Sequence, residues 1–142
     1  MIIDTLHTTF SEGQAVTATA ISENVILLND AGTVHGEGAA ITRNLGIGNE
    51  IPLLIQVTED FDALTTLEIT LETSAAAALT SPTVMASSGA IALADLVAGY
   101  RPSFTRILPD GDLLDYIGMR YTVVGTDPTV GKITAAIAGA VS

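Results

Sequence analysis

Apolar residues recur at every second position in several short segments of the chain. In the clearest of these, residues 64–73, leucine and isoleucine alternate with glutamate and threonine, as a half-buried β-strand requires. The same period returns in residues 117–123 and 133–137. It also appears in residues 51–57, with Pro52 near the start, where a missing N–H is tolerated. The pattern therefore predicts at least four strands.

The segments before residue 51 give weaker patterns. Residues 10–14 (FSEGQ) predict a turn, and threonines alternating with apolar residues in 15–21 predict a strand. A short apolar run at 24–28 ends in Asn, Asp and Gly, which favour turns. Residues 29–50 predict a long connection interrupted by glycines.

The middle of the chain is rich in alanine. We expect helical turns at 75–79 and 92–97 around a strand at 83–87, then an edge strand at 100–108. Turns are expected at 109–112 and 125–128. Seven or eight short strands without long helices favour an all-β fold. We therefore expect one domain, residues 1–142, folded as an antiparallel jelly-roll-like β-sandwich.

Charge narrows the range of partners. The chain carries 16 acidic and five basic residues, a formal net charge of −11. Residues 1–80 hold eleven of the acidic groups but only one cation, Arg43. We expect no nucleic-acid partner, because binding phosphate requires concentrated cations. The start of the chain does not resemble a signal peptide, and no apolar run is long enough for a membrane helix. We therefore expect no membrane partner and synthesis in the cytoplasm.

Candidate chemical motifs all have simpler interpretations. The paired glycines at 36–38 and 46–48 lack the third glycine and following helix of a dinucleotide-binding loop, so we interpret them as surface loops. The acidic clusters at 110–115 and 59–62 lack the spacing of a calcium-binding EF-hand and are interpreted as turns. Adventitious calcium at either remains an alternative.

No catalytic group stands out either. His7 and His35 are far apart, whereas zinc needs at least three protein ligands. The chain has no cysteine, and Ser87-Ser88-Gly89 lacks the pattern of a nucleophile elbow. We expect no enzyme activity, no cofactor and no bound metal.

Arginine and tyrosine occur together in the C-terminal part, at Tyr100-Arg101, Arg106 and Arg120-Tyr121. Both residue types are enriched in interface hot spots. One hypothesis is that these arginines meet the acidic N-terminal part of a neighbouring copy. The alternative is that the tyrosines fill the core and the arginines are solvated.

Motifs along nearly the whole chain resemble the capsid cement, or decoration, proteins of short-tailed bacteriophages of the Bordetella-phage type. The segments that carry the resemblance are residues 1–6, 10–17, 24–26, 51–57, 67–74, 87–91, 96–101, 108–109 and 119–123. Residues 44–49 and 113–115 depart from the family pattern.

The resemblance implies a jelly-roll protein on the outside of an icosahedral head. Such a protein clamps neighbouring major capsid proteins against internal DNA pressure, usually as a homodimer. A homotrimer is a further possibility. It would be part of the virion. From the sequence itself we expect both termini, with residues 1–10 as a possible capsid-binding arm, and the Gly-rich loop at 32–48 to face the capsid, because ordering on the shell would give such segments a role. The candidate interface residues are Ile2, Ile3, Leu6, Phe10, Tyr100, Arg101, Arg106 and Arg120.

Two other classes compete with this interpretation. Jelly rolls also occur as carbohydrate-binding modules, but these stack sugars on aromatic rings, and this chain has three Tyr and no Trp. A jelly-roll enzyme of the cupin type would need a histidine cluster for its metal, and the chain has only two histidines.

Overall fold

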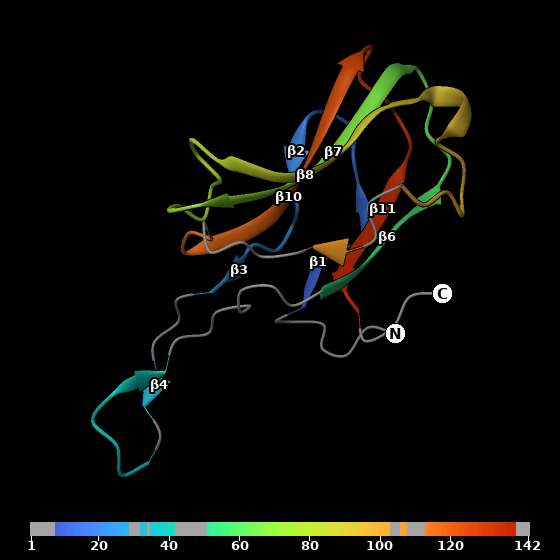
Figure 1. Cartoon of the computed structure of the whole chain (residues 1–142). Coiled ribbons are helices and arrows are strands. Elements are labelled where there is room, and N and C mark those ends of the chain that lie inside the picture. Colours follow the sequence, from blue (N-terminus) through green and yellow to red (C-terminus); the bar gives the residue numbers. More distant parts are fainter. Residues whose placement is uncertain are drawn as a thin grey trace.

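The computed structural model describes residues 8–28, 32–33, 35–41, 51–102, 106–107 and 113–138. These ranges form eleven strands and a short 3-10 helix (Figure 1). The elements are β1 (Thr9–Ala15), β2 (Ala20–Ile21), β3 (Ile26–Leu27), β4 (Gly32–Thr33), β5 (Ala40–Ile41), β6 (Ile51–Glu59), β7 (Leu64–Ser74), β8 (Thr83–Ala92), η1 (Leu93–Asp95), β9 (Arg106–Ile107), β10 (Tyr116–Gly125) and β11 (Lys132–Ile137).

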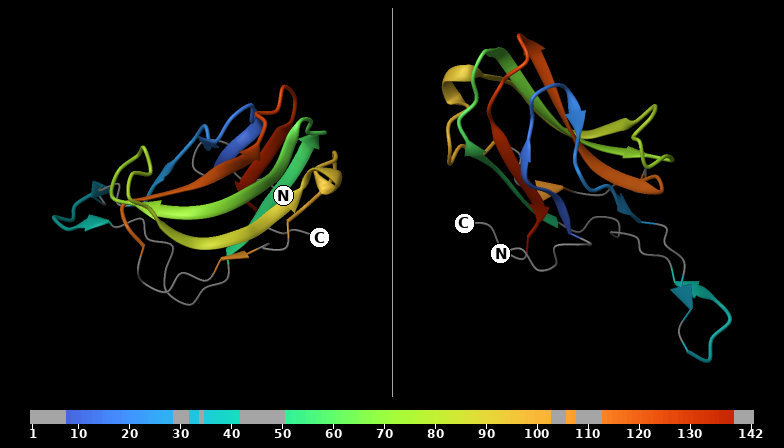
Figure 2. Two further views of the ribbon diagram at one scale, coloured as in Figure 1. Left: turned by 90° about the horizontal axis from the view of Figure 1, so that it is seen from above. Right: turned by 180° about the vertical axis from the view of Figure 1, so that it is seen from behind.

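Two antiparallel sheets face each other. The smaller sheet has the order β1-β11-β6-β9, and the larger has the order β2-β10-β7-β8. The short strand β3 pairs with β10 along the same edge as β2. Figure 2 shows the curved larger sheet lying across the smaller one. The expectation of an all-β antiparallel sandwich is therefore confirmed.

The core lies between the two sheets. Inward side chains of β7 pair directly with those of β10, as in Leu71 opposite Met119 and Ile69 opposite Tyr121. The smaller sheet contributes side chains such as Ile55, opposite Ala135. All six are at most 3% exposed. The alternation that predicted strands at 64–73, 117–123 and 51–57 is thus the inward face of β7, β10 and β6.

The far face of the larger sheet is also partly covered. The β7–β8 loop, residues 75–82, begins where Ser74 accepts a bond from the Ala76 N–H and donates one to the Thr80 carbonyl (3.1 and 2.7 Å). Leu79 in this loop is 1% exposed and lies over Gly118, where an added Cβ would stand 2.9 Å from the leucine side chain. This cover explains why β7 is buried on both faces from Leu71 to Ser74.

A small hairpin formed by β4 and β5 projects away from the two sheets (Figure 1). Each of its strands has two residues. The side chains of Thr33, His35, Glu37 and Ala39 are exposed. The long connection expected across 29–50 therefore contains, in its described part, a short hairpin that the sequence did not predict.

The expected boundaries at the start of the chain are also wrong. Residues 10–14 were expected to turn, yet they lie within β1, and most of the expected strand at 15–21 is not extended. Gly13 has a φ of 58°, and the pairing of β1 with β11 shifts register between Ser11 and Gln14. The strand therefore has a bulge at this point. A bulge commonly contains glycine at positive φ, as turns do, and this is why the sequence predicted a turn within the strand.

The alanine-rich middle and the expected edge strand need smaller corrections. Residues 75–79 form a turn, not a helix, and only Leu93–Asp95 within 92–97 is helical. The strand expected at 83–87 extends to Ala92. Of the strand expected at 100–108, Arg106–Ile107 is extended and lies at a sheet edge, whereas residues 100–102 are not in a strand.

Two aspartates fasten loops at one end of the sandwich. Asp62 accepts bonds from the Thr129 N–H and hydroxyl and from the Val130 N–H, at 2.6–3.1 Å. Asp60 accepts from the Ala98 N–H at 2.7 Å. This acidic turn was expected between β6 and β7, and its carboxylates link it to the loops after β10 and after η1.

Gly131 is a residue at which an added side chain should be costly. Its φ is 134°, and a Cβ would overlap the Phe61 ring. We predict that Gly131→Ala lowers the free energy of unfolding by about 1–3 kcal/mol, as overpacking does, measured by urea denaturation. The matched control is Gly38→Ala, because a Cβ there meets nothing within 4 Å. Equal stability of the two variants would contradict this packing.

Asp62 should contribute to the acid sensitivity of the fold. The Thr129 hydroxyl, followed by the Val130 and Thr129 N–H groups, lowers the pKa of Asp62 below its ordinary value of 3.8. A lowered folded-state pKa gives stability that is present above about pH 4 and is lost as pH falls through the folded value.

We therefore predict that Asp62→Asn loses less melting temperature than the wild type between neutral pH and about pH 2.5. The control is Asp127→Asn. Asp127 is an exposed aspartate in the β10–β11 turn that Asp62 contacts, and its replacement should leave the wild-type dependence of melting temperature on pH unchanged. A steeper acid loss in Asp62→Asn than in the wild type would refute the assignment.

Candidate interaction surface

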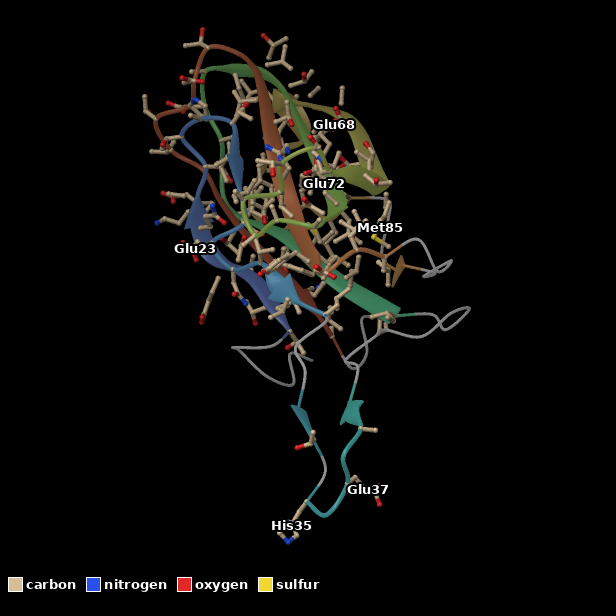
Figure 3. The ribbon with its side chains drawn as sticks, turned by 90° about the vertical axis from the view of Figure 1, so that its left-hand side faces the viewer. Glu23, His35, Glu37, Glu68, Glu72 and Met85 are labelled. Atoms are coloured by element: carbon tan, nitrogen blue, oxygen red, sulfur yellow. The ribbon has the colours of Figure 1, made fainter. Side chains whose placement is uncertain are left out.

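Reactive side chains are scattered over the described residues. Within these residues, no group of three or more histidine, cysteine, aspartate or glutamate side chains is arranged to hold a metal ion. His35 and Glu37 lie at the tip of the β4–β5 hairpin, away from the sheets (Figure 3). His7 and the predicted turn at 109–112 lie outside the described residues. No described helix is long and apolar enough to cross a membrane.

A buried polar cluster joins the two sheets. Ser11 on β1 donates to Gln14 Oε1 at 2.6 Å and lies 2.7 Å from the Tyr121 hydroxyl on β10. Because the serine proton is directed to Gln14, Tyr121 is the donor to Ser11. Gln14 Nε2 in turn donates to the Ile21 carbonyl on β2. Burial raises the pKa of Tyr121, so the phenol remains a neutral hydrogen-bond donor. This cluster fixes one sheet against the other.

Arg120 forms a buried ion pair on the far face of the larger sheet. Its Nε lies 3.0 and 2.9 Å from the two carboxylate oxygens of Glu72, and its NH2 group donates to the Leu79 carbonyl at 2.9 Å. The glutamate side chain is 5% exposed and the arginine side chain 28%. Thr70 also donates to the carboxylate. The guanidinium thereby ties the β7–β8 loop to the sheet.

This geometry changes the view of Arg120 as an interface residue. Its charge is balanced by Glu72 of the same chain, 48 residues away in sequence. It is neither simply solvated nor directed only at a neighbouring copy, which were the two interpretations of the sequence. We therefore interpret Arg120 as a residue that positions the β7–β8 loop on the outer face of the larger sheet.

The other candidate interface residues fall into three groups. Phe10 is 0% exposed in the core, so the folded chain offers no Phe10 surface to a partner, and residues 9–10 belong to β1 instead of a free arm. Tyr100 is half-buried against the core and Arg101 is exposed. Arg106 lies on β9, opposite Pro52 of β6. Ile2, Ile3 and Leu6 lie outside the described residues.

Tyr100, Arg101 and Arg106 belong to one strip beside β6. The Val57 N–H of β6 donates to the Tyr100 carbonyl at 2.9 Å, and Pro52 near the other end of β6 pairs with Arg106. The structure thus places these three residues along one edge of the smaller sheet. Arg120 lies on the larger sheet, so the four residues do not form one patch.

Sequence reasoning missed a second edge, that of β8. This strand is mostly exposed, and Ser87 and Ser88, which lack the pattern of a nucleophile elbow, lie at a bulge. The Ser88 hydroxyl accepts from the Ile69 N–H at 3.0 Å, and Gly89 has a φ of 67°. Ser87 donates to Glu68 at 2.6 Å. The available signal was the absence of charged residues from Thr73 to Ala94, a segment without alternation of apolar and polar residues.

Comparison with known protein families relates the chain to one of them. The protein-family model described as Bbp16 matches residues 10–137. Its name indicates a protein of a Bordetella phage. A search of the curated proteins finds no match.

We predict that Arg120→Met destabilises the fold strongly, because it leaves the Glu72 carboxylate buried without its counter-ion. Breaking one partner of a buried pair typically costs about 3–5 kcal/mol, measurable by urea denaturation. The control is Lys132→Met, because Lys132 pairs with Glu59 with side chains 48% and 42% exposed. An exposed pair of this kind contributes about 0–1 kcal/mol.

The double variant Arg120→Met/Glu72→Met separates charge from packing. If the cost arises from the unpaired carboxylate, removing both charges should recover much of the lost stability. Similar unfolding free energies for the Arg120→Met and Lys132→Met variants would contradict the buried pair.

Proposed function

The chain belongs to the Bbp16 family, and on that premise we propose that it is a structural protein of a bacteriophage particle. In this proposal it binds the outer surface of the icosahedral head and cements neighbouring major capsid proteins. The main support is the family match over residues 10–137, which agrees with the resemblance to Bordetella-type cement proteins along the chain. The implied jelly-roll connectivity is part of the same proposal, and the two antiparallel sheets are compatible with it.

The architecture suits a clamp. The body is fixed by the buried Tyr121–Ser11–Gln14 cluster and by the Arg120–Glu72 pair, so force applied at one surface is passed to another without repacking. Each copy would bridge capsid subunits through modest contacts. Many copies on one shell would multiply the effect, because binding at the first contact raises the effective concentration at the second.

The β4–β5 hairpin is the described segment best placed to reach a capsid subunit. It projects from the body, and its exposed side chains include His35 and Glu37 at the tip (Figure 3). A hairpin of two-residue strands is marginally stable alone in water, so contact with another surface would stabilise it. The exposed Arg101, beside the half-buried Tyr100, offers a second contact with a cationic group.

We expect the protein to act as a homodimer, with a trimer as the alternative assembly. Its place would be the outer surface of the virion, reached after synthesis in the host cytoplasm. No catalytic step, cofactor, nucleic acid or membrane is part of this proposal.

We predict that the purified protein co-sediments with phage heads and saturates at a fixed ratio to the major capsid protein. Bound heads should be disrupted at a higher temperature than bare heads, because each bridging copy must be released before its subunits separate. Native and expanded heads should be compared. Absence of binding to both forms would contradict a cementing role.

Two truncations identify the contact segments in the same assay. One removes residues 2–7, which leaves Thr8, whose carbonyl accepts from the Ile137 N–H, and the core residue Phe10 in place. The other replaces residues 35–38 at the hairpin tip with a neutral Gly-Ser segment. Either is informative only if its melting temperature matches the wild type. If neither weakens binding, both segments are excluded as capsid contacts.

A further inference from the structure

The free edge of β8 differs from the other sheet edges. β8 is the last strand of the larger sheet, and among the described elements it pairs with β7 alone. Its ten residues, TVMASSGAIA, include no charged residue and no proline. Six of the ten are exposed. Natural sheets usually protect such edges with charge, proline or shortness, because unpaired N–H and C=O groups are a template for another strand.

The other described edges are protected in these ways. β2, β3 and β9 have two residues each. β1 carries Glu12 and a bulge at Gly13. β8 is therefore the longest uncharged edge in the part of the chain that the structure describes.

We propose that two copies of this chain join through β8, by antiparallel pairing of the two strands around a two-fold axis near Ser87 and Ser88. This inference rests on the proposed homodimer and assigns its contact surface. The result would be one continuous sheet running across both sandwiches. Such an interface is isologous, because the same strand contributes on both sides.

Charge favours a second copy as the occupant. A chain of net charge −11 is repelled by its own copies wherever acidic groups face each other. Two β8 strands meet without opposing any charge. The acidic groups on the adjacent strand β7 are also engaged, since Glu72 pairs with Arg120 and Glu68 accepts from Ser87.

The shape of β8 favours self-pairing as well. Its pairing with β7 shifts register twice, between Glu68 and Thr70 and between Leu71 and Glu72. Bulges bend a strand and increase its twist, so a flat foreign strand fits the edge poorly. In a dimer with two-fold symmetry, the partner strand is β8 of the second copy, which has the identical bend. Small residues at the centre, Ser87 to Ala90, allow close approach of the two backbones.

The natural absence of cysteine allows a clean cross-linking test in the full chain. Ser87→Cys places a thiol near the proposed axis, within the Cα separation of roughly 4.4–6.8 Å that a disulfide requires. Ala92→Cys, also exposed on β8, lies roughly 30 Å from its symmetry mate at about 3.4 Å per residue. We expect mild oxidation to convert Ser87→Cys, but not Ala92→Cys, into a covalent dimer on a non-reducing gel.

A matched pair of valines tests the energetics. Val84 on β8 and Val124 on β10 are both 53% exposed. We expect Val84→Asp to raise the dimer dissociation constant at least about tenfold, because it buries a carboxylate at an edge without cations. Val124→Asp should leave it unchanged. Sedimentation equilibrium of the purified variants gives both values, and wild-type far-UV circular dichroism spectra with cooperative melting confirm that the variants are folded.

Three results would overturn the inference. They are a monomeric wild-type protein at micromolar concentration, equal cross-linking of the two cysteine variants, or equal weakening by the two aspartates. None of these bears on cementing itself, which is measured as binding to heads. Monomers that still saturate heads would refute the β8 dimer alone, and dimers that fail to bind heads would refute the cement proposal alone.

Discussion

The buried pair of Arg120 and Glu72 is the interaction on which the outer surface of the larger sheet depends. A carboxylate with 5% exposure is tolerated only where a counter-ion and hydrogen bonds replace water, and the guanidinium and Thr70 supply these. The same guanidinium holds the Leu79 carbonyl, which keeps the β7–β8 loop folded over Gly118. Without the pair, β7 would need to be solvated on that face.

This constraint separates the protein into a rigid body and exposed contact surfaces. The aliphatic core and the cross-sheet cluster at Tyr121 fix the two sheets relative to each other. The β4–β5 hairpin is separate from that body, whereas the strip beside β6 and the uncharged edge of β8 lie at the edges of its two sheets. A protein that joins other proteins needs a rigid body between its contact surfaces, because a deformable body would absorb the force that should pass from one partner to the other.

The sequence predicted the fold class and the main strands because burial of one face leaves a period of two, as in residues 64–73 and 117–123. It failed for β1, where Gly13 and a bulge imitate a turn, and for the full length of β8, whose small neutral residues carry no period. The arginine-rich segments were visible, but the pairing of Arg120 with Glu72 was not. Contacts across 48 residues depend on strand register, which local patterns do not specify.

The most direct test of the cementing account is cryo-electron microscopy of the mature phage particle at a resolution that separates β-strands. The account predicts two-sheet density on the outer surface of the head, bridging neighbouring capsid subunits, with the projecting hairpin in contact with one of them. Density for this sandwich inside the head, on the tail, or contacting a single capsid subunit without a bridge would contradict it.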